Sequence, residues 1–373
     1  MMISPLRVRV LIQKELRQLF RDPKTKRIVF AAPIIQLLLF GYAVNTDVRN
    51  VATVVVDQDR TTESRLLQEK FEASGYFRIL GVEDDPIGIE RALDGNSAVV
   101  GLQIPPGFAR DLNAGEAGSV QILIDGTNSN TATVVQGYAG GIIREFALDQ
   151  AASRGITVGG GIDLRARAWY NPDLSSQVYN VPGVIGLLLV LMALLLTALS
   201  VVRERELGTL EQLMVSPISA KELILGKTIP VVIICMMDLA LITAVALLWF
   251  QIPLRGSAGA LILASFVYIL AGLGAGLFIS TISRTQQEAF LTMFLFLLPG
   301  IILSGFMYPV DTMPEIFQHL TLLNPVRYFM EMVRGIFLKG HGVADLWGHY
   351  LVLTGMALFA IVGASSRFKK SLE

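Results

Sequence analysis

The stretch that decides the fold is RERELGTLEQLMVSPISAKELILGKT, residues 203–228. It is polar, yet it lies between two apolar runs, 179–202 and 229–250. Each run is long enough to cross a bilayer as a helix, because a hydrocarbon core of ~30 Å needs roughly 20 apolar residues. We therefore predict a membrane-surface loop with a short helix that begins after Gly208 and ends at Pro217. An ordinary amphipathic helix lying on lipid headgroups is the alternative for this loop.

The composition is that of a polytopic membrane protein. Of 373 residues, 53% are hydrophobic, and the mean hydropathy is +0.56. The formal net charge is zero, so no large basic surface indicates a nucleic-acid partner. The single cysteine, Cys235, can form no intramolecular disulfide, and one thiol is too few for a cysteine-based metal site. We expect no metal site and no catalytic residues.

The N-terminal part combines basic and apolar residues. Residues 1–27 contain eight Lys or Arg and an apolar helical face, which predicts an interfacial helix on the anionic cytoplasmic leaflet. Residues 28–45 form the first predicted span, and the positive charge before it places the N-terminus in the cytoplasm.

Residues 46–178 are polar enough to form a water-soluble domain. Apolar, β-branched runs alternate in it with helical patterns, which predicts a small α/β domain on the outer side of the membrane. The predicted strands are 51–56, 77–82, 98–104 and 120–124, and the predicted helices are 61–73, 87–93 and 130–152. Asp57 and Asp59 follow the first strand without the spacing of a calcium loop, so we expect a strand-end turn there.

The rest of the chain returns to the membrane. The predicted parts are 179–202 (second span), 203–228 (cytoplasmic loop), 229–250, 257–282 and 289–304 (third to fifth spans), 305–345 (outer re-entrant helices), 346–366 (sixth span) and 367–373 (cytoplasmic tail). The inner segments carry sixteen Lys or Arg and the short outer segments four, as the positive-inside rule requires. The predicted fold is a polytopic α-helical membrane protein with six transmembrane helices and an α/β extracytoplasmic domain between the first and second.

No segment has the pattern of an ATP-binding loop. Gly226-Lys227-Thr228 matches the end of a Walker A motif, but Lys221 stands where its first glycine belongs. Asp238 lies inside the third predicted span, where a charge costs about 2.5–3.5 kcal/mol on insertion scales. It therefore faces protein or a water-filled cavity, either on a translocation path or in a hydrogen bond between helices.

Two blocks of sequence resemble the signature of ABC-2 type transporter permeases. The first comprises Arg203 to Glu206, Gly208 to Leu213, Pro217 and Leu225 to Lys227. The second comprises Leu303 to Pro309, Met313-Pro314, Leu323 to Phe329 and Arg334 to Phe337. The resemblance covers the whole chain, and the large domain after the first span is similar to that of the bacterial multidrug-efflux branch.

The resemblance implies a permease subunit of an exporter in the bacterial inner membrane, with both termini cytoplasmic. The loop would hold a coupling helix that docks on a separate ATPase; the coupling residues would be Arg203, Glu204, Arg205, Glu206, Gly208, Thr209, Leu210, Glu211, Gln212, Leu213 and Pro217. Charged residues among them give a surface able to pair with charges on that partner. ATP and magnesium would bind to the ATPase, and no cofactor to this chain.

Other partners follow from the same resemblance. They are a second copy or a paralogue of the permease, membrane lipids and, in some relatives, a periplasmic adaptor of the membrane-fusion class. We place a substrate pathway at Asp238, Pro299, Gly305, Pro309, Asn324 and Pro325. The expected substrate is hydrophobic or amphipathic, drug-like or lipid-like. The alternative function is a membrane-anchored sensor or scaffold whose outer domain binds a ligand.

Overall fold

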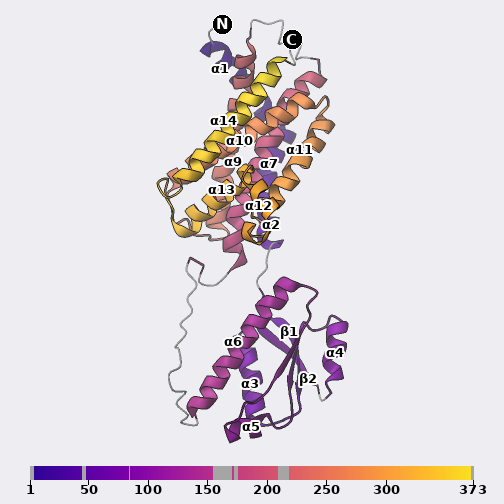
Figure 1. Ribbon diagram of the computed structural model, residues 1–373. Helices are drawn as coiled ribbons and strands as arrows, with labels where there is room; N and C mark the ends of the chain where they lie inside the picture. The colour runs from indigo at the N-terminus through magenta and orange to yellow at the C-terminus, as the bar shows by residue number, and fades with distance from the viewer. Residues whose placement is uncertain are drawn as a thin grey trace. The chain divides into compact units, whose positions relative to one another are not determined.

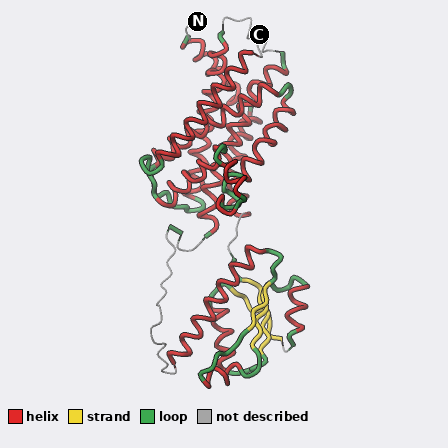
Figure 2. The backbone as a smooth tube through the Cα atoms, in the orientation of Figure 1, coloured by secondary structure: helices red, strands yellow, loops and turns green. Residues whose placement is uncertain are grey.

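The computed structural model describes residues 4–43, 48–83, 85–153, 170–171, 175–208 and 218–370. The chain forms two compact units. One consists of Met1–Asn45 together with Ala168–Glu373, and the other of Thr46–Arg167. The first is a bundle of helices, and the second is a sheet flanked by helices (Figures 1 and 2).

The helical unit is built from long apolar helices and several short ones. Its elements are α1 (Pro5–Arg21), α2 (Pro23–Ala43), α7 (Ser176–Glu206), α9 (Ala220–Leu248), α10 (Ala258–Ile282), α11 (Gln286–Ile302), the 3-10 turn η1 (Val310–Thr312), α12 (Glu315–Thr321), α13 (Pro325–Arg334), the π-helical turn η2 (Gly335–Lys339) and α14 (Trp347–Lys370).

Helix α7 is the centre of this unit. It contacts α2, α9, α10, α11 and α13. Glycines of α10 let two helices approach closely, since a Cβ at Gly272 would lie 3.0 Å from Ala193 of α7, and one at Gly276 would lie 2.8 Å from Thr197. Small residues at such contacts are the usual means of close packing between membrane helices.

Five helices in the described part are long and apolar enough to cross a membrane: α2, α7, α9, α10 and α14. Helix α11 is also apolar, but its 17 residues reach only about 26 Å at 1.5 Å per residue. The structure therefore supports a bundle of several membrane helices, and the count of six spans stays a prediction.

The predicted loop 203–228 is shorter in the structure. Helix α7 continues to Glu206, and α9 already begins at Ala220 rather than at 229. The reason is a capping box: the Ser219 side chain accepts from the Glu222 backbone N–H, and the Glu222 carboxylate accepts from the Ser219 N–H. The charged residues before the apolar run are thus the first turns of the helix.

The sheet unit has four strands, β1 (Val51–Asp57), β2 (Phe77–Glu83), β3 (Val100–Ile104) and β4 (Gln121–Ile124), in the order β2-β1-β3-β4. The first three are parallel, and β4 runs antiparallel to β3. One face packs on α3 (Thr62–Ala73), α5 (Phe108–Ala114) and α6 (Ser129–Ser153), and the other on α4 (Ile87–Asp94) (Figure 1). The sequence did not predict α5.

The end of β1 is a polar junction rather than a cation site. Asp57 Oδ2 accepts from Ser64 Oγ (2.6 Å) and Gln68 Nε2 (2.8 Å). The Asp59 carboxylate accepts from the backbone N–H groups of Gly107 (2.7 Å) and Ala109 (2.9 Å). Both aspartates therefore serve as hydrogen-bond acceptors that join neighbouring segments, and the described residues contain no cluster that could hold a metal ion.

Candidate functional site

A buried lysine joins three helices at the end of the bundle that holds α1. Lys227 of α9 donates to Glu15 Oε1 of α1 at 2.7 Å and to Glu204 Oε1 of α7 at 2.9 Å. Its side chain is 6% exposed. Lys14 of α1 reaches the same Glu204 oxygen at 3.4 Å. We call Glu15, Glu204 and Lys227 the inner ionic cluster; it links α1 to the ends of α7 and α9 that flank residues 207–219.

A second contact fixes the start of α1 on the start of α9. Glu222 Oε1 accepts from the backbone N–H of Ser4 at 2.7 Å, and Arg7 lies 3.8 Å from Glu222 Oε2. Between these contacts the two helices pack closely, because a Cβ at Gly226 would lie 2.7 Å from the Leu11 Cβ. Helix α1 is therefore held on α9 by both polar and apolar contacts.

The end of α7 also reaches α10 and α11. Arg205 Nη1 donates to the backbone oxygens of Ser283 (2.8 Å) and Ser280 (3.3 Å), where α10 ends. Such a contact satisfies terminal carbonyl groups of the helix. Glu206 Oε2 accepts from Gln286 Nε2 at 2.7 Å, at the start of α11.

The predicted coupling residues in the described part also have contacts within the chain. Glu204, Arg205 and Glu206 each bond to another helix, and their pairing with a partner stays a prediction. Arg203 is exposed. Gly208 has φ +69°, the left-handed conformation with which helices commonly end. Of the predicted coupling residues, Thr209, Leu210, Glu211, Gln212, Leu213 and Pro217 lie outside the described residues.

Asp238 lies within α9, away from both ends of the helix. Its side chain is buried, with the residue 1% exposed, and neither carboxylate oxygen has a hydrogen-bond partner in the described part of the chain. The hydrogen bond between helices that we considered from the sequence is thus not formed by these residues. A buried carboxylate without a partner is costly unless it is protonated or finds a ligand.

The other predicted pathway residues lie around the end of α11 and the start of α13. Asn324 caps α13 by accepting from the Val326 N–H at 3.1 Å, and its Nδ2 donates to the Gly300 oxygen at 2.7 Å, next to Pro299. Pro325 is the first residue of α13, where a missing N–H costs nothing. The structure thus brings Pro299, Asn324 and Pro325 together.

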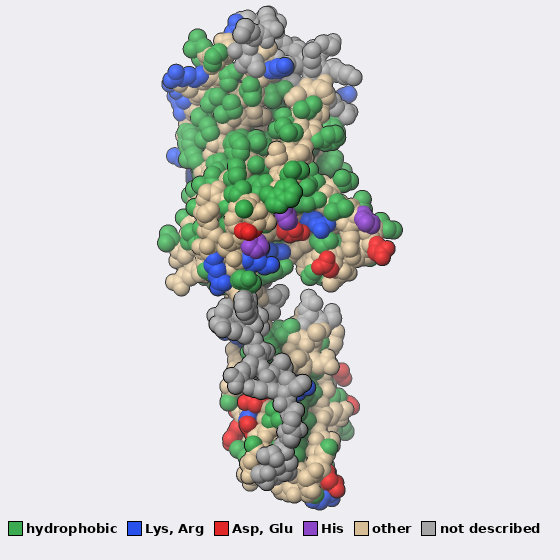
Figure 3. Space-filling model, turned by 60° about the vertical axis from the view of Figure 1, so that its left-hand side comes forward, with side chains coloured by type: hydrophobic (Ala, Val, Ile, Leu, Met, Phe, Trp, Pro, Cys, Tyr) green, Lys and Arg blue, Asp and Glu red, His purple; other side chains and the backbone are tan. Residues whose placement is uncertain are grey.

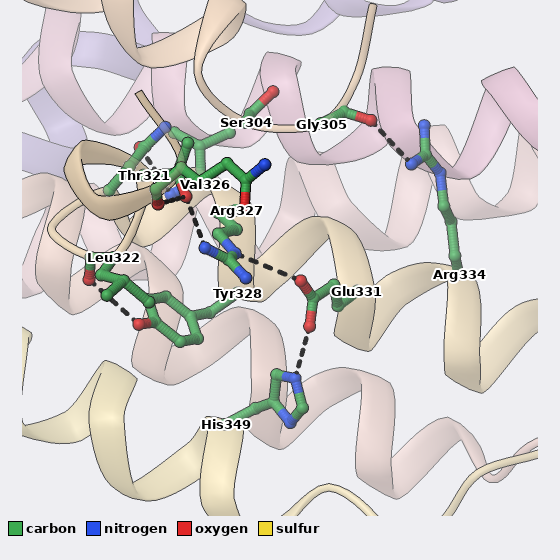
Figure 4. A network of polar contacts seen from close by, with 12 residues as sticks. Ser304, Gly305, Thr321, Leu322, Val326, Arg327, Tyr328, Glu331, Arg334 and His349 are labelled. Atoms are coloured by element: carbon green, nitrogen blue, oxygen red, sulfur yellow. Dashed lines mark hydrogen bonds and ion pairs between the residues drawn. The ribbon is translucent and has the colours of Figure 1, made fainter. Parts of the chain in front are cut away.

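Gly305 and Pro309 shape the turn between α11 and η1. Gly305 has φ +78°, and its carbonyl accepts from Arg334 Nη1 at 3.1 Å (Figure 4). Pro309 is exposed, and its carbonyl accepts from the Thr312 N–H at 3.1 Å. Asp238 is not among these neighbours.

The comparisons with known proteins agree with this architecture. A family model described as ABC-2 family transporter protein matches residues 27–365. The chain belongs to the ABC-2 transporter family. It is 33% identical over 361 residues to "Probable multidrug ABC transporter permease YbhR" of Escherichia coli strain K12, covering 95% of this chain and 98% of that protein.

Two further relatives from the same strain match over nearly their whole length. "Probable multidrug ABC transporter permease YbhS" is 32% identical over 373 residues, covering 100% of this chain and 99% of the relative. "Inner membrane transport permease YhhJ" is 27% identical over 376 residues, covering 96% of each. This ABC-2 chain is accordingly a permease subunit, a transporter component without an ATPase site of its own.

The structure of this ABC-2 permease also shows polar contacts that we did not predict. In Figure 4, Arg327 Nε lies 3.4 Å from Glu331 Oε1, and His349 Nε2 of α14 lies 2.7 Å from Glu331 Oε2. The spacing of Arg327 and Glu331, four residues apart on a helix, was a signal in the sequence. The contact with His349 was not readable, because it depends on how α13 packs on α14.

Proposed function

We propose that this chain couples ATP hydrolysis on a separate ATPase to the export of a hydrophobic or amphipathic substrate across the bacterial inner membrane. The observation that carries the proposal is the inner ionic cluster. The cluster joins α1 to the two long helices that flank residues 207–219, namely α7 before them and α9 after them. A partner that moves this loop would move both helices together.

The orientation of the chain follows from the distribution of charge. Helix α1 carries exposed basic side chains, among them Arg9, Arg17 and Arg21. Figure 3 shows hydrophobic side chains over the middle of the helical unit, Lys and Arg side chains at its α1 end, and Lys and Arg mixed with Asp, Glu and His at the opposite end. Basic residues favour the cytoplasmic side. We therefore place α1, both termini and the ATPase in the cytoplasm, and the α/β unit outside.

The nature of the substrate is inferred from apolar surfaces and from the relatives. A groove of about 680 Å³ lies between α10, α11 and α14, and its lining includes Gly274, Phe278, Phe296, Phe359 and Ala364. Two relatives bear names that call them probable multidrug permeases. Both observations favour an apolar or amphipathic molecule. The exposed apolar faces of α2, α11 and α14 suit lipids and a second permease copy or paralogue.

Reconstitution tests the proposal. The permease is purified with the ATPase encoded next to it and placed in proteoliposomes, where ATPase activity and uptake of a fluorescent amphipathic dye into inside-out vesicles are measured together. We expect dye transport that requires ATP. The variants Gly208→Pro and Glu211→Arg should keep ATPase activity but lose most transport, because they change the loop that joins α7 to α9. Wild-type transport in both variants would refute the coupling role.

A further inference from the structure

Arg334, the last residue of α13, is half-buried, and the hydrogen bonds of its guanidinium group are incomplete. Nη1 donates to the Gly305 carbonyl at 3.1 Å (Figure 4), and Cζ lies 3.9 Å from the centre of the Tyr179 ring. In the described part of the chain, neither Nε nor Nη2 has an acceptor, although both atoms are buried. Two of the three guanidinium nitrogens thus have no hydrogen-bond partner.

These two nitrogens form one edge of the guanidinium group. The N–H of Nε and one N–H of Nη2 point in the same direction, side by side, whereas Nη1 lies on the opposite side. A parallel pair of this kind matches the two oxygens of a carboxylate or of a phosphate, which arginine binds through two hydrogen bonds at once. The contact with Gly305 uses the other nitrogen and leaves this edge available.

The described residues supply no counter-ion for this cation. Among the described residues, Arg334 forms no ion pair. Glu331, one turn earlier on α13, bonds instead to Arg327 and His349. The Gly305 carbonyl and the Tyr179 ring account for Nη1 and for one contact of the charge. They leave the buried Nε and Nη2 atoms without an acceptor, which is unfavourable.

Tyr179 packs against the guanidinium. It lies in the first turns of α7, covers one face of Arg334, and is itself 41% exposed. Gly183, one turn further along α7, has no side chain; a Cβ there would lie 3.4 Å from Nη2. Rotation of the half-exposed Tyr179 ring would remove its contact with the guanidinium without moving the backbone.

We propose that the Nε–Nη2 edge of Arg334 binds the carboxylate or phosphate group of an amphipathic molecule after the Tyr179 ring moves aside. The inference rests on the proposed export function, because it assigns an anionic head group to the exported molecule. A phospholipid head group carries the same chemistry, and the experiment below separates the two sources.

Laurate binding to the permease alone tests the site. The protein is held in dodecylmaltoside micelles, which contain neither carboxylate nor phosphate, and binding of radiolabelled laurate is measured with empty micelles as background. We expect saturable binding that Arg334→Lys weakens at least about tenfold. Lysine keeps the charge but lacks the pair of parallel N–H groups that can bind two oxygens at once. Dodecyltrimethylammonium, a cationic amphiphile, should not compete. Unchanged affinity in Arg334→Lys, or equal competition by the cation, would overturn the proposal.

Two variants serve as controls. Arg327→Lys changes an arginine on the same helix that already pairs with Glu331, and it should leave laurate affinity within about twofold. Tyr179→Leu should retain binding, because it removes the aromatic ring that packs on Arg334 and leaves the guanidinium group unchanged. Loss of binding in either control as large as in Arg334→Lys would contradict a specific role for Arg334. Monodisperse elution of each variant, with its ATPase bound, shows that it is folded.

Two further arms separate the sources and the hypotheses. If added phosphatidylglycerol weakens laurate binding in the parent but not in Arg334→Lys, the lipid head group occupies the site; if it has no effect, the exported amphiphile does. Both results support the anion site. ATP-driven export of amphiphiles that does not depend on Arg334 would overturn the anion site and leave the proposed export function intact. Arg334-dependent binding without any export would support the anion site and overturn the proposed export function.

Discussion

At the scale of single residues, Lys227 connects helix α1 to both α7 and α9. In the sequence, Lys227 belongs to a Gly-Lys-Thr that matches only the end of an ATP-binding loop, and it lies within the predicted cytoplasmic loop. The structure places it inside α9 with Glu15 at 2.7 Å and Glu204 at 2.9 Å. Its partners lie 212 and 23 residues away along the chain, so no local pattern could identify them.

Replacing Lys227 by methionine removes the buried cation that bonds to both Glu15 and Glu204. We expect Lys227→Met to lower the stability of the permease by about 3 kcal/mol, because removing one partner of a buried ion pair exposes the other to an uncompensated environment. The measurement is the melting temperature in nanodiscs. Lys221→Met, an exposed lysine on the same helix, is the matched control and should melt like the parent.

Asp238 can be tested by an almost isosteric change. If its carboxyl group takes part in transport, Asp238→Asn should reduce dye transport more than it reduces the amount of assembled permease–ATPase complex. The reason is that asparagine keeps the size of the side chain but cannot ionise. Unchanged transport at normal expression would remove Asp238 from the substrate pathway.

At the scale of elements, the sequence was most informative where hydrophobic periodicity was strong. The strands of the α/β unit and the long apolar helices have patterns that are visible in one sequence. Helix α9 begins nine residues before the predicted third span, at the Ser219–Glu222 capping box, a signal that the sequence contains and that the apolar run alone does not reveal. Helix α5 is only seven residues long, too short for a periodic signal.

Asn324 joins two elements with one side chain. It caps α13 through its oxygen and bonds the Gly300 carbonyl of α11 through its nitrogen. We expect Asn324→Ala to destabilise the permease by about 1–2 kcal/mol, since it removes a helix cap and a second hydrogen bond. Asn324→Asp keeps the cap but loses the donor, so its melting temperature should lie between those of the parent and the alanine variant. Equal melting of all three would contradict this role.

Asp59 fixes the end of β1 to the turn before α5. Burial raises the pKa of its carboxyl, but hydrogen bonds from Thr61 and from the backbone of Ala109 and Gly107 outweigh this and lower the pKa below the ordinary 3.8. A lowered pKa means that the ionised form stabilises the fold above the unfolded-state pKa, and that this contribution is lost as the pH falls through the folded-state value.

The effect of this carboxylate is measurable by hydrogen exchange at neutral pH. We expect Asp59→Asn to speed amide exchange in residues 107–109, because a neutral amide oxygen accepts these N–H bonds more weakly than a carboxylate. Lowering the pH below the ordinary pKa of 3.8 should reduce the protection factors of these amides, which compare measured with intrinsic exchange rates, in the parent more than in the variant. Identical exchange in parent and variant at neutral pH would show that the contacts contribute little.

At the scale of the whole molecule, the chain combines a bundle of membrane helices of the ABC-2 family with an α/β unit that forms its own compact core. Composition and apolar runs predicted a polytopic membrane protein, and two motif blocks predicted the family, which the family model and the relatives show. The way α7 contacts five other helices was not predictable, because it depends on packing between segments far apart in the chain. The sidedness of the two units stays a prediction.

The most direct test of the central claim is cross-linking between residue 211 and the partner ATPase. Cys235 is buried, so a cysteine introduced by Glu211→Cys can be addressed with little background from the native thiol. We predict that a short bifunctional maleimide joins this position to the ATPase in intact membranes, whereas Gly126→Cys in the α/β unit gives no such product. A Glu211→Cys variant that reacts with a membrane-impermeant maleimide from outside the cell, and never cross-links to the ATPase, would contradict the account.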